Sequence, residues 1–338
     1  HITIIIILNS MIKNSLKKIF IKISRLLGFE IIDQNSFVSP TLNKELNENL
    51  SKFNKKSIIL PLGEVEIKRK IRSLLIIFRT NSNIDIWDQN KKRIFEQDKI
   101  IYVEKSLNSL IKSIKFTEQN LSSLDVKLII LDDNSNDQNL DKIKKICEKA
   151  RISYELINHD IQINKNYIKE QKTRETYSNL STLLTSFNLG KRNGKDLIFF
   201  VEDDYIHFNN LIMECIKTFE RVSSQIGKDI FLCPSDYPFL YMNNEKTNVL
   251  IGSDRHWRTV NKTLCTFFTT KELLDKYWNN FEKNCLDRHD PFEKYLNQIY
   301  ENEICISPLK SLSIHMANIN SSYGLSPFID YKKIWDEN

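Results

Sequence analysis

The chain has 338 residues, of which 41% are apolar and 27% are charged, with only 7 glycines and 7 prolines. This composition is ordinary for a globular protein and excludes collagen-like and low-complexity chains. The net charge of +6 suits anionic ligands or an acidic membrane surface, but no stretch clusters Lys and Arg with aromatics, so no nucleic-acid partner is expected. The six cysteines lack CxxC spacing, which indicates reduced buried thiols rather than disulfides or a zinc site.

Residues 1–57 are predicted to stand apart from the rest of the chain. We interpret residues 1–10 as upstream translation or a boundary artefact, because Met11 follows an apolar run too short to span a bilayer. Residues 12–27 place apolar side chains on one helical face and Lys or Arg on the other. Such a basic amphipathic helix lies on an anionic membrane or packs on the protein or in an oligomer. Residues 33–57 are polar and read as a linker.

From Ser73 onward, short apolar runs alternate with segments of helical periodicity. The expected strands are 74–78, 126–131, 152–157 and 197–201, and the expected helices are 102–114, a Lys-rich segment ending near 150, and 175–189. A less regular half follows, with helices at 211–222, 272–281 and 291–300 and strands at 230–233, 264–269 and 311–315. The alternation predicts an α/β fold with a doubly wound sheet flanked by helices.

Polar side chains follow three of these buried strands. Asp132 and Asp133 follow the second strand, the acids 202–204 follow the fourth, and Arg79 and Thr80 follow the first. Carboxyl ends of parallel strands meet at one edge of a sheet, where ligands bind, so we expect a nucleotide site with a divalent cation there. No GxGxxG or GxxxxGK[ST] occurs, which argues against a Rossmann dehydrogenase or a P-loop enzyme.

Two stretches together resemble a known family. Ile-Ile-Leu-Asp-Asp-Asn-Ser-Asn-Asp at 129–137 and Phe-Phe-Val-Glu-Asp-Asp at 199–204 are similar to motifs of GT-A-fold glycosyltransferases, most like family 2. The resemblance covers residues 73–210 by motif and 211–320 only by general layout. It implies a GT-A-like doubly wound mixed sheet, with residues 58–210 as the nucleotide-sugar half and 211–338 as the acceptor half of one domain.

The resemblance also implies roles for the first group of site residues. Asp132 or Asp133 contacts the nucleobase or ribose, while Arg79 and Thr80 line the nucleotide pocket. A longer segment after the first strand, which contains Trp87, departs from the family pattern.

The acid run 202–204 occupies the place of the family's DxD motif, whose ends ligate a cation on the donor diphosphate. The resemblance makes Glu202 and Asp204 ligands of Mn²⁺ or Mg²⁺, although Glu in the first place is a departure, and leaves Asp203 facing the ribose or sugar. His315 ends a late apolar strand pattern and is a candidate third ligand, since similar enzymes use a late His; a core histidine is the alternative.

The second half must supply the acceptor site and a base. An inverting transfer needs a carboxylate that deprotonates the acceptor hydroxyl. Asp290 is the candidate that the resemblance favours, and an N-cap before Pro291 is the alternative. Asp287 and Glu293 are the fallback choices, and a retaining enzyme would need none of these.

Two stretches are candidate site walls. Residues 235–238 follow a buried strand, and in 253–258 a tryptophan stands among charges. Trp257 could stack on a sugar and Arg258 could hold a phosphate of the donor; core packing and a solvated surface are the alternatives.

The residues therefore favour a metal-dependent, inverting glycosyltransferase that moves a sugar from a nucleotide-diphosphate sugar to a glycan or lipid-linked acceptor in surface polysaccharide synthesis. It is expected in the cytoplasm, with peripheral contact to the inner membrane face through residues 12–27. A sugar-nucleotide nucleotidyltransferase is one alternative, although residues 79–82 are a poor glycine-rich loop for it. A non-catalytic module of the same fold is the other.

Overall fold

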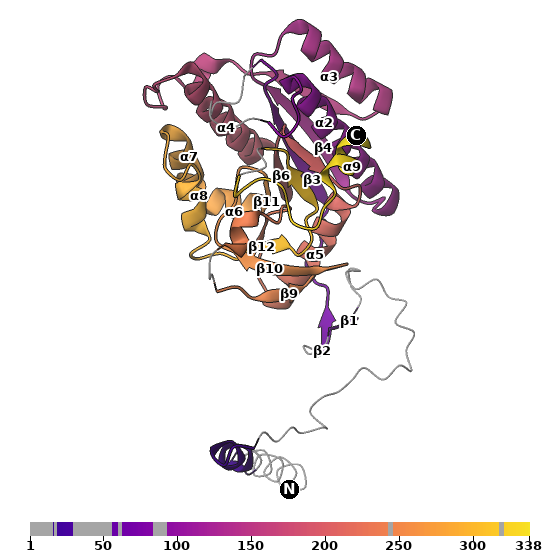
Figure 1. Ribbon diagram of the computed structural model, residues 1–338, viewed down its shortest axis with the longest axis vertical. Coiled ribbons are helices and arrows are strands. Elements are labelled where there is room, and N and C mark those ends of the chain that lie inside the picture. Colours follow the sequence, from indigo (N-terminus) through magenta and orange to yellow (C-terminus); the bar gives the residue numbers. More distant parts are fainter. Residues whose placement is uncertain are drawn as a thin grey trace. The chain divides into compact units, whose positions relative to one another are not determined.

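A computed structural model of the chain describes residues 16, 19–29, 56–59, 63–83, 93–242, 246–317 and 321–338. The chain divides into two compact units, one of residues 1–48 and 58–64, the other of 49–57 and 65–338. The second unit, called the body below, carries the sheet and its covering helices (Figure 1).

A nine-stranded mixed sheet runs through the body in the order β5-β4-β3-β6-β11-β8-β12-β10-β9. Its strands are β3 (Ser73–Thr80), β4 (Asp125–Asp132), β5 (Tyr154–Asn158), β6 (Leu197–Glu202), β8 (Phe231–Leu232), β9 (Val249–Ile251), β10 (His256–Val260), β11 (Phe267–Thr270) and β12 (Cys305–Pro308). The neighbours β5, β4, β3 and β6 are parallel, whereas β11 runs antiparallel to β6. Two small sheets pair β1 (Lys56–Ile59) with β2 (Gly63–Glu66) and β7 (Tyr205–His207) with β13 (Ser313–His315).

Helices cover both faces of the sheet (Figure 1). One face packs on α2 (Lys99–Asn120), α3 (Asp137–Ala150) and α5 (Leu211–Ile226), and the other on α4 (Arg174–Asn193), α6 (Lys271–Lys276), α7 (Trp278–Leu286) and α8 (Lys294–Ile299). The remaining helices are α9 (Tyr331–Asp336) and the 3-10 turns η1 (Ile161–Asn164) and η2 (Pro238–Tyr241). Local chemistry sets the helix starts: the Asn136 side chain, for example, accepts the Asn139 N–H at 2.8 Å and caps α3.

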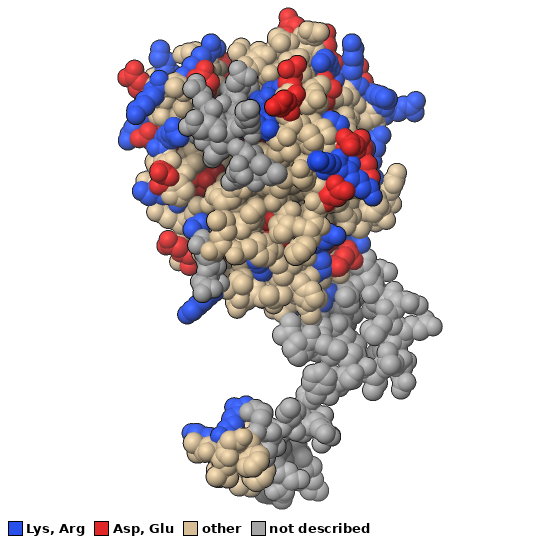
Figure 2. All heavy atoms as spheres, in the orientation of Figure 1, with Lys and Arg blue, Asp and Glu red and all other residues tan. Residues whose placement is uncertain are grey.

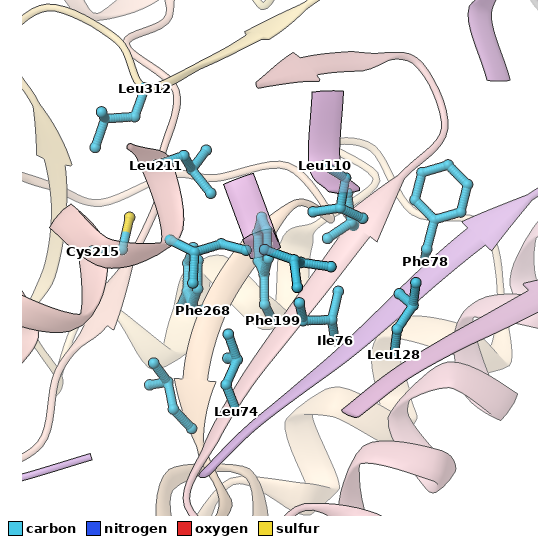
Figure 3. Packing of buried hydrophobic residues seen from close by; sticks show 14 of the residues in the cluster. Leu74, Ile76, Phe78, Leu110, Leu128, Phe199, Leu211, Cys215, Phe268 and Leu312 are labelled. Atoms are coloured by element: carbon cyan, nitrogen blue, oxygen red, sulfur yellow. The ribbon is translucent and has the colours of Figure 1, made fainter. Parts of the chain in front are cut away.

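The core on the α2 side is built from alternate side chains of the strands. Leu74, Ile76 and Phe78 project from β3 toward the α2 and α5 side, where Leu110 and Leu211 meet them (Figure 3). Phe199 and Phe268 stack across β6 and β11 with ring centroids 3.8 Å apart. Since both faces of these strands are buried, the sequence there is apolar without alternation, as a covered parallel sheet requires.

The structure confirms the predicted mixed α/β sheet flanked by helices, and every strand and helix expected between residues 73 and 315 has a counterpart in it. It adds short elements that the pattern did not indicate, β7, β9, β10 and β12, and it splits the helix expected at 272–281 into α6 and α7. The division of the body at residue 210 stays a prediction.

Residues 19–26 of the N-terminal unit are helical. The rest of the predicted amphipathic segment, residues 12–15, 17 and 18, lies outside the described residues, as do residues 1–10, most of the expected linker, and Trp87. Within the described residues, no helix is both long enough and apolar enough to cross a membrane.

Candidate functional site

The ends of three parallel strands meet at one edge of the sheet, as the sequence predicts. Thr80 of β3 pairs with Asp132 of β4, and Arg79 of β3 pairs with Glu202 of β6. This register aligns the side chains that follow each strand, and it defines the candidate site.

Arg79 and Glu202 bind each other in the floor of this site. Arg79 Nη2 donates to Glu202 Oε1 at 2.7 Å, and Nη1 donates to the Asn179 side chain of α4 at 2.5 Å. Burial raises the pKa of Glu202, and the Arg79 guanidinium counters part of that rise. Arg79 is thus held by protein groups on both sides, and one carboxylate oxygen of Glu202 is already occupied.

Asp203, the middle acid of the run, is fully occupied by protein donors. Its Oδ1 accepts from Lys99 Nζ at 2.5 Å, and its Oδ2 accepts from the Asn81 N–H at 2.9 Å and from the Thr80 hydroxyl at 3.2 Å. These bonds tie the start of α2 and the loop after β3 to the end of β6. Asp203 and Thr80 therefore help to hold the site together, and their predicted contacts with the ribose or sugar and with the nucleotide stay predictions.

Asp132 and Asp133 differ in how their oxygens are used. Asp133 accepts from the Asn81 amide at 3.1 Å and from the Ser178 hydroxyl. Asp132 accepts the Ser135 N–H at 2.9 Å with Oδ2, but its buried Oδ1 has no hydrogen-bond partner among the described residues. Burial raises the pKa of Asp132. A buried acceptor of this kind lacks a donor that a ligand N–H or hydroxyl can provide.

Asp204 and His315 come from distant parts of the chain and face each other. Antiparallel pairing of β7 with β13 places His315 opposite Tyr205, and His315 Nε2 lies 3.3 Å from Asp204 Oδ2. Burial alone would raise the pKa of Asp204, but the charges of His315 and Lys99 hold it far below its usual range. The other oxygen of Asp204, Oδ1, has no hydrogen-bond partner among the described residues.

The proton on His315 is assigned by its second partner. Nδ1 lies 2.8 Å from the Tyr323 carbonyl oxygen, which can only accept, so Nδ1 carries the hydrogen. Burial would lower the pKa of His315, but the Asp204 carboxylate raises it, so without a cation the charged ring, with Nε2 donating to Asp204, is favoured. The neutral ring would instead present a lone pair at Nε2. That contact is favourable only with a proton or a cation between the two groups. At 3.3 Å it is also longer than a charge-assisted hydrogen bond.

Aromatic residues fix the orientation of the His315 ring. The Tyr205 ring stacks on it with centroids 4.6 Å apart and planes 9° apart. The Tyr205 hydroxyl is 2.7 Å from that of Tyr237, and both phenols are buried. Metal-binding histidines are held by a backbone carbonyl in this way, with packing that sets the ring plane.

The described residues fit a divalent cation through two protein ligands. Asp204 offers an unpartnered carboxylate oxygen and His315 offers Nε2, which would give up its proton to a cation, whereas Glu202 is bonded to Arg79. No group of three or more His, Cys, Asp or Glu side chains placed to hold a metal occurs among the described residues. A pair of ligands suits Mg²⁺ or Mn²⁺, which keep waters and bind substrate phosphates as their other ligands.

The predicted helix start at Asp290 is wrong. Helix α8 begins at Lys294, and Asp290 is exposed ahead of it. The Asn284 side chain of α7 accepts the N–H groups of Tyr295 and Leu296 at 3.1 and 3.4 Å, so another helix caps α8. No N-cap role is left for Asp290.

Glu293, a fallback candidate for the base, lies close enough to the site to feel its charges. Burial and the negative charge of Glu202 raise the pKa of Glu293 to about 8, while His315 and Arg79 oppose the rise. Its Oε1 is 3.9 Å from Cys265 Sγ. Glu293 is therefore a better placed carboxylate than the exposed Asp290.

Residues 253–258, the second candidate wall, contact the core and buried carboxylates of the protein. Trp257 is fully buried in the core, so the predicted sugar stacking is wrong. Arg258 of β10 forms an ion pair with the carboxylate of Asp236. Its guanidinium lies 4.3 Å from the centre of the Tyr241 ring. Arg255 holds the buried Glu214 instead of facing solvent. Arg258 is thus already paired with a buried carboxylate, four strands away from β6.

Sequence reasoning missed several residues of the site. Lys99, Asn179 and Ser178 lie on helices and carry no motif of their own, and Tyr205 directly follows the acid run. Only Tyr205 had a usable signal, because an aromatic beside a candidate metal cluster often packs on a ligand.

No protein-family model matches this chain, and no curated protein matches it. Among solved structures, it is similar to S. aureus TarS 1-349, with 12% identity over 71% of this chain and 59% of that chain and a TM-score of 0.42. It is also similar to the galactosyltransferase LgtC in complex with donor and acceptor sugar analogs (9% identity, 67% and 70% covered, TM-score 0.34). A third similar structure is a cytidylyltransferase from Leptospira borgpetersenii. It has 12% identity over 72% of this chain and 78% of that chain, with a TM-score of 0.35.

The chain spans 59% of the length of the TarS fragment. Similarity at these identities and TM-scores assigns neither a fold family nor an activity. The α/β architecture described above rests on the strands and helices of the chain itself.

Proposed function

We propose that this protein is a metal-dependent glycosyltransferase of the GT-A type that uses a nucleotide-diphosphate sugar. The observation that carries the proposal is the Asp204–His315 pair, in which Nδ1 is held by the Tyr323 carbonyl oxygen and Nε2 faces the Asp204 carboxylate at 3.3 Å. Asp204 lies two residues after the buried strand β6, at the sheet edge where nucleotides bind in α/β folds, and His315 reaches it from the end of β13. The similarity of residues 129–137 and 199–204 to family 2 motifs agrees with this assignment.

The donor would be bound by residues with separate tasks. Asp132 Oδ1, a buried acceptor, would receive a base N–H or ribose hydroxyl. Asp204 and His315 would hold Mn²⁺ or Mg²⁺, and Glu202 would contact it through water. When bound, the cation stabilises the charge of the leaving diphosphate. Arg79 would line the pocket, and its bond to Glu202 keeps that carboxylate oriented.

Transfer to an acceptor hydroxyl with inversion requires a proton acceptor on the opposite side of the sugar. We assign this role to Glu293 in preference to Asp290, because Glu293 is half-buried and close to the charges of the site. A general base works best with a pKa near the working pH, and with a pKa of about 8 the carboxylate form of Glu293 predominates only above that pH. The acceptor would be a glycan or a lipid-linked hydroxyl, as in surface polysaccharide synthesis.

A reducing compartment such as the cytoplasm suits this protein. All six cysteines are free and buried, and burial raises the pKa of thiols such as Cys147 and Cys233, which keeps them protonated. Nucleotide-diphosphate sugars would meet the enzyme there.

A binding screen tests the proposal without a known acceptor. UDP, GDP, CDP and dTDP are titrated into the protein by calorimetry, with Mn²⁺ or with EDTA. For each nucleoside diphosphate that binds, the corresponding sugar nucleotides are then assayed for release of that nucleoside diphosphate. We expect one base to bind with Mn²⁺ at least tenfold more tightly than without it. Asp204→Asn and His315→Gln should remove this metal dependence, whereas the exposed Asp141→Asn and His256→Gln should keep it.

Three results would overturn the proposal. If no nucleoside diphosphate binds in a metal-dependent manner, the site does not hold a sugar-nucleotide donor. If pyrophosphate is released from a nucleoside triphosphate and a sugar phosphate instead, the protein is a nucleotidyltransferase. A protein that binds a nucleoside diphosphate together with the metal but turns over no sugar-nucleotide donor would be a binding module.

A further inference from the structure

The described part of the N-terminal unit carries a run of exposed apolar side chains. The exposed fractions are 61% for Leu16, 56% for Ile19, 61% for Phe20, 50% for Ile23, 82% for Leu26, 70% for Leu27 and 69% for Phe29. The positions 16, 19, 20, 23, 26 and 27 follow the spacing of one helical face. Side chains of this kind are normally buried, so this face requires a partner.

Basic side chains occupy the other side of the same helix. Lys22 and Arg25 are exposed there, and Figure 2 shows the blue side chains of this helix gathered on one side and the tan ones on the other. The sequence between residues 12 and 29 contains five Lys or Arg and no Asp or Glu. Ser24, the one buried polar residue of the helix, donates its hydroxyl to the Phe20 carbonyl oxygen at 2.9 Å and needs no outside partner.

We propose that this helix lies on an anionic lipid bilayer, with its apolar face in the acyl boundary and Lys22 and Arg25 at the headgroup phosphates. A broad apolar arc opposite a purely basic one is the pattern of helices that lie in the membrane interface. The anionic lipids supply the negative charge that the segment itself lacks. The helix would lie in the plane of the membrane, because the described residues hold no helix long and apolar enough to span it.

A second copy of the chain is a less suitable occupant. Positions 16 to 27 cover fewer than two heptads, and a stable coiled coil needs three or four. Pairing two such helices would also bring basic residues together without any acidic partner. The membrane removes both difficulties, because lipids accept a wide apolar face and neutralise the cations.

The experiment uses the full chain and sucrose-loaded vesicles, sedimented from solution. One set contains phosphatidylcholine alone and the other contains phosphatidylcholine mixed with phosphatidylglycerol. We expect the chain to bind the anionic vesicles and to be released by salt, because the basic side chains contribute through a screened attraction.

Two variants with matched controls separate the apolar and the basic contributions. Leu26→Glu/Leu27→Glu should weaken binding at least tenfold, while Ile163→Glu, on a body residue that is 63% exposed, should not change it. Lys22→Gln/Arg25→Gln should weaken binding to anionic vesicles by roughly tenfold or more. Lys165→Gln/Lys172→Gln, which removes two exposed charges of the body, should leave binding within about twofold.

The outcomes show whether a membrane or a second copy of the chain covers the apolar face of the helix. Absence of binding to anionic vesicles, or equal losses in variants and controls, would overturn the proposal. A wild type that is dimeric by light scattering, with a Leu26→Glu/Leu27→Glu variant that is monomeric and binds vesicles as before, would assign the face to a second copy. Thermal unfolding of each variant checks that the body is intact. None of these measurements depends on catalysis.

Discussion

Lys99 Nζ lies 2.5 Å from Asp203 Oδ1, which joins the first residue of α2 to the middle acid of the 202–204 run. Both side chains are largely buried, at 16% and 10% exposure, and Asp203 also accepts from the loop after β3. Burial alone would lower the pKa of Lys99, but Asp203 and Asp204 raise it, so the ammonium stays charged. Three neighbouring acids are thus tolerated because Lys99 neutralises Asp203 and Arg79 neutralises Glu202 inside the protein.

Replacing this lysine should therefore affect stability and spare the metal site. Lys99→Met leaves the Asp203 carboxylate buried without its cation, and the free energy of unfolding should fall by about 3 kcal/mol. Metal affinity should not fall, because the change removes a positive charge near Asp204. Chemical denaturation and Mn²⁺ titration measure the two effects. Lys127→Met, which breaks an exposed pair with Glu155, should cost less than about 1 kcal/mol.

The choice between Glu293 and Asp290 can be tested by two matched amide substitutions. Glu293→Gln should lower kcat by roughly 10²–10⁴-fold, because the amide cannot accept the acceptor proton. The KM for the donor should change little, since the donor contacts proposed above lie on β3, β4, β13 and the residues at the end of β6. Asp290→Asn alters an exposed side chain and should keep most of the activity. The opposite ranking would return the base to Asp290.

The parts of the site that sequence reasoning predicted follow directly from strands. Residues 132 and 202 each end an apolar run, and parallel register alone brings such ends together. His315 was identified by its place at the end of a strand pattern, although its pairing with β7 could not be read from the sequence. The placement of residues 132 and 202 needed only local periodicity and one general rule about sheets, whereas the metal role of His315 was implied by the resemblance to GT-A glycosyltransferases.

The errors lie where a side chain is positioned by packing between distant elements. Asn284 caps α8 from another helix, so the Asp-Pro signal at 290 was misleading. For Trp257 of β10 the sequence leaves sugar stacking and core packing open, and only the fold shows that it is buried in the core. Lys99 looked like any other lysine of a lysine-rich chain, and only the fold brings it to Asp203. Such contacts depend on tertiary geometry that no spacing rule contains.

The stack between Tyr205 and His315 should control metal affinity. Tyr205→Leu removes the ring that fixes the imidazole plane, and we expect Mn²⁺ to bind roughly 10–100-fold more weakly. Tyr205→Phe retains the ring and should lose only a small part of the affinity. Tyr237→Phe breaks the same hydroxyl contact without touching the stack, and it serves as the control. Equal losses in all three variants would indicate a general disturbance of the core instead.

Glu220 of α5 should make the stability of the body depend on pH. Its side chain is 7% exposed, and Oε1 accepts the Ile71 N–H at 2.8 Å. Burial raises its pKa to about 7, although the Ile71 N–H and the positive charges of Lys70 and Arg69 oppose the rise. The pKa in the unfolded chain is about 4.3. Between these two values the folded state binds the extra proton, so stability falls as pH rises through this window.

Replacement by glutamine isolates this effect, because the amide oxygen can still accept the Ile71 N–H and no longer ionises. The difference in unfolding free energy, Glu220→Gln minus wild type, should grow by about 2–3 kcal/mol between about pH 5 and about pH 8. Urea denaturation across that range measures the difference. Glu148→Gln, at an exposed position of α3, should give a flat difference. A flat difference for Glu220→Gln as well would mean that the basic neighbours of Glu220 keep its carboxylate ionised in the folded state, against the burial argument.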